Sequence, residues 1–453
     1  MTNRQFLLLS LLLILARHDA SAQDTNYWTD QFGNRARLLG GAVVGSATDL
    51  SAVYYNPGAL ALVTKPELLL AGTVFEYTKI NVAGGERLDA GSSTFRLSPS
   101  LFAGEVKIGA LRGHRLAYSF LTRQSVDNRV RLRGSLGGDV LSPTSDLAFL
   151  SGDVRLEQGV SEHWLGVTWA HDVRSRAGIG VTQFLAVRNH HASYQTLIQA
   201  LGKDNEGAVA VDKRDFRYQH WRLLWKIGLA TELERWKLGL TVTTPSLGLG
   251  GSGAAGYDRT LVQQDAGGGG TTQLATDFQP GVASDYRSPF SIAFGASYPL
   301  GRLRKTRFHV SAEWFDRVEA FRILDTQAFT AQSSGETVPR DLFYTLDPVF
   351  NVALGLEHQI RENLKAYGSF RTDFSGAVTG TQTIAVTRWD IYHVAAGASF
   401  KVGRSDLTAG AVAAFGGSKS PLRPDLLLGE VVDEVQSRFY RLTFILGFNF
   451  TFE

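Results

Sequence analysis

Five basic residues occupy polar positions in segments where polar and apolar side chains alternate: Lys226, Lys237, Lys365, Arg371 and Arg441. Neighbouring side chains of a strand point to opposite faces, so each cation would share a face with other polar groups. An ammonium or guanidinium group near apolar side chains could bind the carboxylate of an amphipathic ligand. The alternative is that each cation is solvated or paired with a nearby carboxylate.

The chain offers little other chemistry. It has no cysteine, which excludes a disulfide scaffold, a thiolate metal site and a cysteine nucleophile. The adjacent His190 and His191 would point in opposite directions on a strand, so they could not hold one metal ion. No Gly-x-Ser-x-Gly motif marks a serine nucleophile. We therefore expect no enzyme activity, metal or cofactor; a lipase or deacylase is the enzymatic alternative.

The final segment, residues 439–452, alternates most clearly. Its even positions are all apolar: Tyr440, Leu442, Phe444, Leu446, Phe448, Phe450 and Phe452. The odd positions are mostly polar or small, with Phe439 and Ile445 as exceptions. A strand that crosses a bilayer needs about ten residues, apolar toward lipid and polar toward a barrel interior. We predict that this segment is a transmembrane strand whose even row faces lipid.

Similar alternation recurs throughout the chain after residue 66, for example in residues 236–242, 290–298 and 308–314. We count roughly fourteen such segments, often longer than a usual soluble strand of about five or six residues. Trp and Tyr near their ends are typical of the aromatic girdles of membrane barrels. We therefore predict an all-β fold, a transmembrane antiparallel β-barrel of about fourteen strands over residues 66–453. A large soluble β-sandwich or propeller is the alternative.

The N-terminus predicts export. Arg4 precedes the apolar residues 6–16, and the small residues 20–22 follow as a cleavage site. This pattern predicts a secretory signal peptide over residues 1–22, too short to span a membrane as a helix. An N-terminal anchor or a buried helix is the alternative. Together with the barrel, the signal predicts Sec-type export to the outer membrane of a Gram-negative bacterium.

The connections between the predicted strands differ in length. Short ones alternate with long ones, which run approximately over residues 190–214, 245–288, 318–348, 374–388 and 416–436. Short turns at one end and long loops at the other are typical of outer-membrane barrels. Four consecutive glycines, residues 267–270, predict that the longest of these loops is flexible.

Residues 23–65 do not alternate and are predicted to form a plug inside the barrel. A barrel of fourteen strands leaves a lumen that must be filled. Pro57 fixes its own φ and keeps Asn56 out of a helix. A buried Asn can then bond to neighbouring backbone and make the turn rigid. An ordinary loop turn is the alternative.

The surrounding sequence DLSAVYYNPGALAL, residues 49–62, resembles the hatch motif of the FadL-type long-chain fatty acid transporters. Asn56 and Pro57 match the motif, whereas Gly58 and Ala59 reverse the usual Ala-Gly order. Residues 239–249, 286–298 and 310–316 match strands of that family more loosely, in the same order along the chain. The resemblance implies a fourteen-stranded barrel with an N-terminal hatch, gated around these four residues.

The resemblance also implies a function. It predicts passive uptake of hydrophobic compounds, fatty acids or hydrocarbons, through a lumen pocket and out sideways through a gap in the wall. The alternative is a structural or protein-secretion role, since some FadL-type barrels resemble shuttle components of the type IX secretion system.

The expected partners follow from these predictions. They are outer-membrane lipid, a hydrophobic small molecule, and the barrel-assembly machinery. The C-terminal aromatic Phe452 resembles the signal read by that machinery, although Glu453 follows it. The net charge of +3 is too balanced to indicate a nucleic-acid partner, and nothing in the chain indicates an oligomer, so we expect a monomer.

Overall fold

The computed structural model describes most of the chain. The described ranges are residues 25–63, 67–84, 88–106, 113–137, 147–174, 176–265, 267–340, 342–378, 389–420 and 435–452. The predicted signal peptide over residues 1–22 lies outside them, as do most of the predicted loops 374–388 and 416–436. Within the described ranges, no helix is long and apolar enough to cross a membrane.

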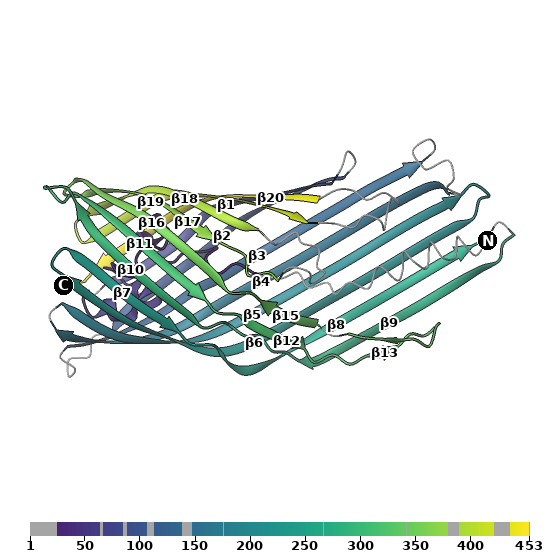
Figure 1. Ribbon diagram of the computed structural model, residues 1–453, viewed down its shortest axis with the longest axis horizontal. Helices are drawn as coiled ribbons and strands as arrows, with labels where there is room; N and C mark the ends of the chain where they lie inside the picture. Colours follow the sequence, from purple (N-terminus) through teal and green to yellow (C-terminus); the bar gives the residue numbers. More distant parts are fainter. Residues whose placement is uncertain are drawn as a thin grey trace.

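The wall of the molecule is a closed ring of fourteen antiparallel strands (Figure 1). The ring closes because β20 pairs with β1 over nearly its whole length, from Glu67 opposite Thr451 to Ala83 opposite Gln436. This confirms the predicted barrel. In ring order the strands are β1 (Glu67–Gly84), β2 (Leu88–Val106), β3 (His114–Gly137), β4 (Leu147–Arg174), β5 (Ala177–Gly202), β6 (Gly207–Leu233), β7 (Trp236–Thr243), β10 (Ser291–Leu300), β11 (Thr306–Phe315), β16 (Val349–Arg361), β17 (Leu364–Asp373), β18 (Asp390–Val402), β19 (Ser405–Ser420) and β20 (Val435–Thr451).

The last strand has the two faces that its sequence predicts. Tyr440, Phe444 and Leu446 are 42–55% exposed on the outer face, whereas Arg441 and Ile445 between them are buried toward the interior. Outward-facing apolar side chains recur around the ring, among them Leu165, Val167, Ile227, Leu229, Phe294, Phe350, Leu356 and Phe400. A soluble protein would bury such a belt, so the belt indicates contact with lipid.

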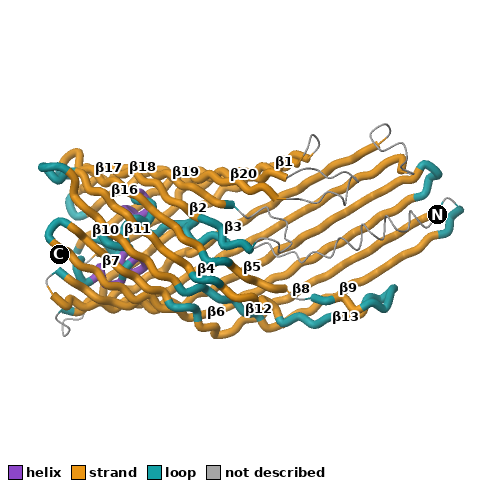
Figure 2. The backbone as a smooth tube through the Cα atoms, in the orientation of Figure 1, coloured by secondary structure: helices purple, strands orange, loops and turns teal. Residues whose placement is uncertain are grey.

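Four neighbouring strands continue far beyond this belt. β3, β4, β5 and β6 have 24 to 28 residues, more than twice the length needed to cross a bilayer. Near the barrel β6 pairs with β7, and farther out it pairs with β8 (Leu247–Gln264), which in turn pairs with β9 (Gly270–Ala283). Figures 1 and 2 show these strands projecting from one end of the barrel. We call this projecting sheet the extension.

The extension corrects two loop predictions. Residues 190–214 and 245–288 are mostly paired strands. Residues 267–269 belong to the β8–β9 connection, where Asp265 N donates to Gly269 O, and Gly270 begins β9 opposite Gln264. Outside lipid both faces of a strand can be polar: on β6, Arg217 points outward and the buried His220 points inward. The alternation of polar and apolar residues that indicates a strand in the sequence is therefore lost, although the strands still pair through their backbones.

The connection between β11 and β16 is also structured. It contains a two-stranded ribbon of β12 (Val318–Leu324) and β15 (Leu342–Leu346), and a small hairpin of β13 (Phe329–Thr330) and β14 (Thr337–Val338). This connection leaves the barrel at the same end as the extension. The short connections, such as β16–β17 and β18–β19, lie at the opposite end.

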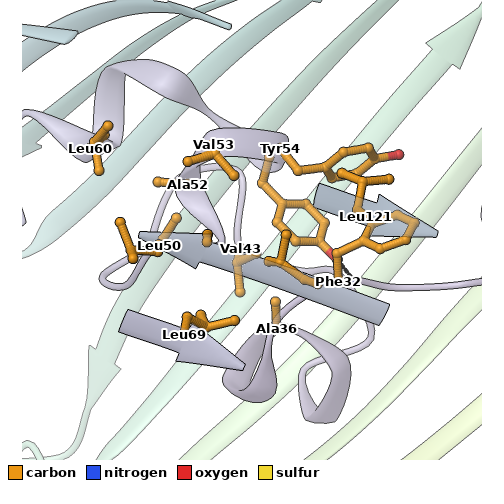
Figure 3. Packing of buried hydrophobic residues seen from close by; sticks show 14 of the residues in the cluster. Phe32, Ala36, Val43, Leu50, Ala52, Val53, Tyr54, Leu60, Leu69 and Leu121 are labelled. Atoms are coloured by element: carbon orange, nitrogen blue, oxygen red, sulfur yellow. Dashed lines mark hydrogen bonds between the residues drawn. The ribbon is translucent and has the colours of Figure 1, made fainter. Parts of the chain in front are cut away.

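Residues 25–63, here called the N-terminal segment, lie inside the ring (Figure 2). They contain three short helices: α2 (Asn34–Leu38), α3 (Ala52–Tyr55) and α4 (Pro57–Leu60). Apolar side chains of the segment such as Phe32 and Leu50 are fully buried and cluster with Leu69 and Leu121 of the wall (Figure 3). The segment therefore shares one hydrophobic core with the barrel.

The lipid-facing row of β20 makes a testable prediction. We expect Leu446→Arg to destabilise the inserted barrel by about 2–4 kcal/mol, because the charge would lie against hydrocarbon. The measurement is heat-modifiable folding and yield in outer membranes. The matched control is Thr451→Arg on the inner face near the strand end, which should insert normally. Normal insertion of Leu446→Arg would contradict the lipid-facing assignment.

Candidate functional site

Asn56 connects the N-terminal segment to the barrel wall. Its side-chain oxygen accepts a hydrogen bond from the Gly58 N–H at 3.1 Å, which caps α4. Its amide nitrogen donates to the carbonyls of Val44, at 2.8 Å, and of Leu229 on β6, at 2.9 Å. Pro57 occupies the first turn of α4, where its missing N–H costs nothing. One fully buried side chain thus links the turn, a neighbouring loop and the wall.

Gly58 lies where only a glycine fits. A Cβ atom at this position would lie 2.6 Å from the carbonyl oxygens of both Gly178 on β5 and Gly228 on β6. The wall glycines make the same approach from their side, since a Cβ at Gly228 would meet Asn56 Oδ1 at 2.2 Å. Ala59, in contrast, is buried in the apolar core of the segment. At this wall, glycine is therefore needed at residue 58, and alanine fits at residue 59.

Polar contacts hold the opposite side of the N-terminal segment. Arg35 forms a 2.7 Å ion pair with Glu357 on β16. Arg37 donates to the Gly72 carbonyl on β1 at 2.8 Å. The Trp28 N–H donates to Asp373 at the end of β17, also at 2.8 Å. The segment is thus fastened by charge-assisted hydrogen bonds to the β1, β16 and β17 side of the ring.

Four of the five cations predicted as ligand contacts take part in such local contacts. Arg371 donates to the Trp28 and Thr29 carbonyls at 3.1 and 3.0 Å. Lys237 pairs with Glu232, Lys365 pairs with Glu357, and Arg441 lies 3.8 Å from both Asp30 and Glu76. These contacts agree with the alternative given above, in which each cation has a local polar partner and does not bind a ligand. The structure does not bring the five cations together.

Lys226, the fifth cation, lies at a cavity between the N-terminal segment and the mouth of the barrel. Its ammonium group lies 4.4 Å from the ring centre of Tyr54. Burial raises the pKa of Tyr54 to about 12, so the ring beneath Lys226 is neutral. The cavity has a volume of about 50 Å³, room for only a few water molecules. Its charged lining residues are Arg123, Glu162, Arg222, Lys226 and Glu313.

Two buried arginines surround Glu162 above this cavity. Arg188 contacts Glu162 at 2.9 Å and Arg222 contacts it at 2.6 Å. Both guanidinium groups stack on the ring of Tyr286, at 4.1 and 4.7 Å from its centre. Within the described structure, Arg222 Nη1 has no hydrogen-bond partner. A buried guanidinium with an unused donor is a ready site for an anionic oxygen.

Sequence reasoning missed these arginines. Glu162, Arg188 and Arg222 lie on three different strands, and only the strand register brings them together. Glu162 pairs directly with Arg188 across β4 and β5, and Arg188 pairs with His220, two residues from Arg222 on β6. Inward positions of long strands were the available signal, but one sequence does not specify which residues pair across strands.

The wall itself has one weak junction. β2 and β3 pair over only six positions, Leu101 to Val106 with Leu121 to Leu116, although both strands continue past Leu101 and Leu121. Beyond that point β2 pairs with β1 and β3 pairs with β4. Pro99, which cannot donate a hydrogen bond, lies just past the junction. Leu101 and Leu121 pack against the core of the N-terminal segment.

Known structures share this architecture. The toluene transporter TodX from Pseudomonas putida aligns with a TM-score of 0.61 over 94% of this chain and 100% of its own, at 14% identity. A FadL homologue from Pseudomonas aeruginosa aligns with a TM-score of 0.59, covering 94% and 100%, at 12% identity. The toluene transporter TbuX from Ralstonia pickettii gives 0.54, covering 93% and 98%, at 11% identity.

These alignments confirm the resemblance to FadL-type barrels at the level of the fold. No known family model matches the sequence, and no curated protein matches it either. The shared feature is therefore the architecture, and what passes through this barrel has to be argued from its own residues.

The contact at Gly58 makes a second prediction. We expect Gly58→Val to destabilise the folded barrel by about 1–3 kcal/mol, because the added atoms would meet two backbone carbonyls that cannot rotate away. The measurement is thermal unfolding in detergent micelles. Gly134→Val on β3, where a Cβ would meet nothing within 4 Å, is the control. Equal unfolding temperatures for the two variants would show that the close contact has no energetic role.

Proposed function

We propose that this chain is an outer-membrane channel through which hydrophobic molecules enter by passive diffusion. The outward apolar belt, the FadL-type architecture and the similar known structures support this function: two are toluene transporters and one is a FadL homologue. In outer-membrane barrels the short turns face the periplasm. The extension and the β12–β15 ribbon then face the outside of the cell.

In this proposal, residues 23–65 act as a hatch gated around Asn56, Pro57, Gly58 and Ala59. The cavity beside Lys226 is too small for an alkyl chain or an aromatic ring, so the structure corresponds to a closed state. Passage requires part of the N-terminal segment to move. When the hatch returns, its hydrogen bonds to the wall form again and restore the closed state.

The contacts of the hatch indicate a direction of movement. Polar bonds fasten it to β1, β16 and β17, and Arg123 and Gln124 of β3 donate to the carbonyls of Tyr27 and Asn26. Nearer the short turns, Leu101 and Leu121 of the weak β2–β3 junction contact it through apolar side chains. Apolar contacts have no fixed geometry and can be replaced by an apolar ligand. We therefore place the exit at the β2–β3 junction, where a ligand would pass sideways into lipid without crossing water.

The charges around the cavity favour an amphipathic acid as the ligand, and this observation carries the proposal for the substrate class. Among the residues that the structure describes at and beside the cavity, the buried cations Arg123, Arg188, Arg222 and Lys226 outnumber the buried carboxylates Glu162 and Glu313. Burying unbalanced positive charge is costly, and an anionic head group would relieve that cost. A neutral hydrocarbon would not. The apolar lining residues Trp164, Leu224 and Phe315 could contact the acyl chain.

A structural or protein-holding role is the second candidate. The closed cavity and the large ordered extension favour it, because a barrel that only holds a partner needs no open path. The two functions differ in one observable. A holding barrel does not restore uptake to a strain that lacks its own transporter, whereas a channel does.

Lys226 provides a test of the ligand class. We expect Lys226→Met to lower uptake of a labelled long-chain fatty acid by about tenfold, the loss of one charge-assisted hydrogen bond. Toluene uptake should change less than twofold. Both rates would be measured in a transport-deficient outer-membrane strain that expresses the variant at the wild-type level.

Lys237→Met is the matched control, because Lys237 pairs with Glu232 far from the cavity. It should leave both rates unchanged. Equal losses for the two variants, or equal losses of fatty acid and toluene uptake in Lys226→Met, would refute carboxylate recognition by the cavity.

A further inference from the structure

The β12–β15 ribbon closes the barrel at the end opposite the short turns. It leaves the wall after β11 and returns to it at β16. Figure 1 shows β12 and β15 where the barrel passes into the extension. The ribbon directs a row of apolar side chains into the mouth, and each of them is at most 5% exposed: Val318, Phe321, Ile323, Leu324, Tyr344 and Leu346. A connecting loop with no role in closure would not bury such a row.

Both edges of the ribbon are fastened by backbone hydrogen bonds. On one side, Asp285 N donates to Ile323 O at 2.9 Å and Asp325 N donates to Ala283 O at 3.0 Å. On the other side, Asp347 N donates to Gly376 O at 2.8 Å, just after β17. The ribbon therefore spans the mouth from the end of β9 to the end of β17.

The same few residues also connect the ribbon to the start of the N-terminal segment. Leu346 forms a β-bridge with Ala377, and Asn26 forms one with Ser375. Gly376 N donates to Thr25 O at 2.9 Å. Residues 375–377 thus lie between the ribbon on one edge and the first described residues of the N-terminal segment on the other, as the middle strand of a short ladder.

A third contact connects the ribbon to the buried arginines. The rings of Tyr344 on β15 and Tyr286 lie 5.5 Å apart, and Tyr286 is the ring on which Arg188 and Arg222 stack. An anion that binds these arginines would disturb the ring against which the ribbon packs. The ribbon is therefore in contact with both the hatch and the proposed ligand site.

We propose that the β12–β15 ribbon is an outer gate, coupled to the hatch through residues 375–377 and to the ligand site through Tyr286. The inference rests on the proposed uptake function and specifies how that site is regulated. A ligand reaches the arginines only after the ribbon leaves the mouth. Displacing the ribbon pulls on the ladder at Thr25 and Asn26 and so loosens the hatch. The barrel then has two gates that open together.

A reversible lock tests the gate. Ser284 and Leu324 lie opposite each other in a β-bridge whose two hydrogen bonds join the neighbouring residues. In such a non-hydrogen-bonded pair the two side chains lie close enough for a disulfide. The chain has no cysteine, so Ser284→Cys with Leu324→Cys places the only two thiols. We expect oxidation of this variant to lower fatty acid uptake at least tenfold, and reduction to restore it. The reduced form is its own folding control.

The matched control is Arg322→Cys with Phe343→Cys, a cross-strand pair whose two residues both belong to the ribbon. Its oxidation should change uptake less than twofold, because the ribbon can still move as a unit. Equal uptake by the oxidised and reduced Ser284→Cys/Leu324→Cys protein, while the wild type transports, would overturn the outer gate and leave the channel function standing. Absence of uptake by the wild type would overturn both.

Hydrogen–deuterium exchange tests the coupling. In the oxidised lock we expect amide exchange over residues 52–60 of the hatch to slow at least tenfold relative to the reduced form. The control cross-link should not slow it. Unchanged hatch exchange in a lock that blocks uptake would overturn the coupling between the two gates.

Discussion

Lipid leaves no water to satisfy backbone N–H and C=O groups, so a membrane sheet must close on itself. Pairing of β20 with β1 and of β5 with β6 closes this ring, and the ring then encloses a lumen that has to be filled. The N-terminal segment fills it with an apolar core that continues into the wall. The buried N-terminal segment, the cavity and the mouth ribbon all follow from this one requirement of closure.

The N-terminal segment meets the wall in chemically different ways. On β5 and β6, backbone touches backbone through Gly58, Gly178 and Gly228, and Asn56 bonds across the contact. On β1, β16 and β17, ion pairs and hydrogen bonds fix the position. At the β2–β3 junction Leu101 and Leu121 contact the segment through apolar side chains, and farther along β3 Arg123 and Gln124 donate to the carbonyls of Tyr27 and Asn26. The junction with the fewest paired positions in the wall thus contacts the segment partly through apolar side chains.

The interior beside the N-terminal segment is rich in buried charge. Arginines stacked on Tyr286 and held by Glu162 concentrate positive charge in a buried site. Low local polarity strengthens each of these interactions and makes an unmatched charge costly. The same fold carries toluene transporters, so the architecture does not set the ligand; the charges that line the cavity would do so.

The features that follow from the alternation of polar and apolar residues could be read from the amino-acid sequence. The alternating row of residues 439–452, the barrel and its lipid-facing side could be predicted, because a strand in lipid must be apolar on one face only. Asn56 and Pro57 marked the turn inside the lumen. The extension could not be predicted, since outside lipid the outward positions of a strand need not be apolar. The cluster of Glu162, Arg188 and Arg222 depends on strand register, which only the folded sheet decides. Likewise, the need for glycine at residue 58 became visible only once its two opposing carbonyls were in place.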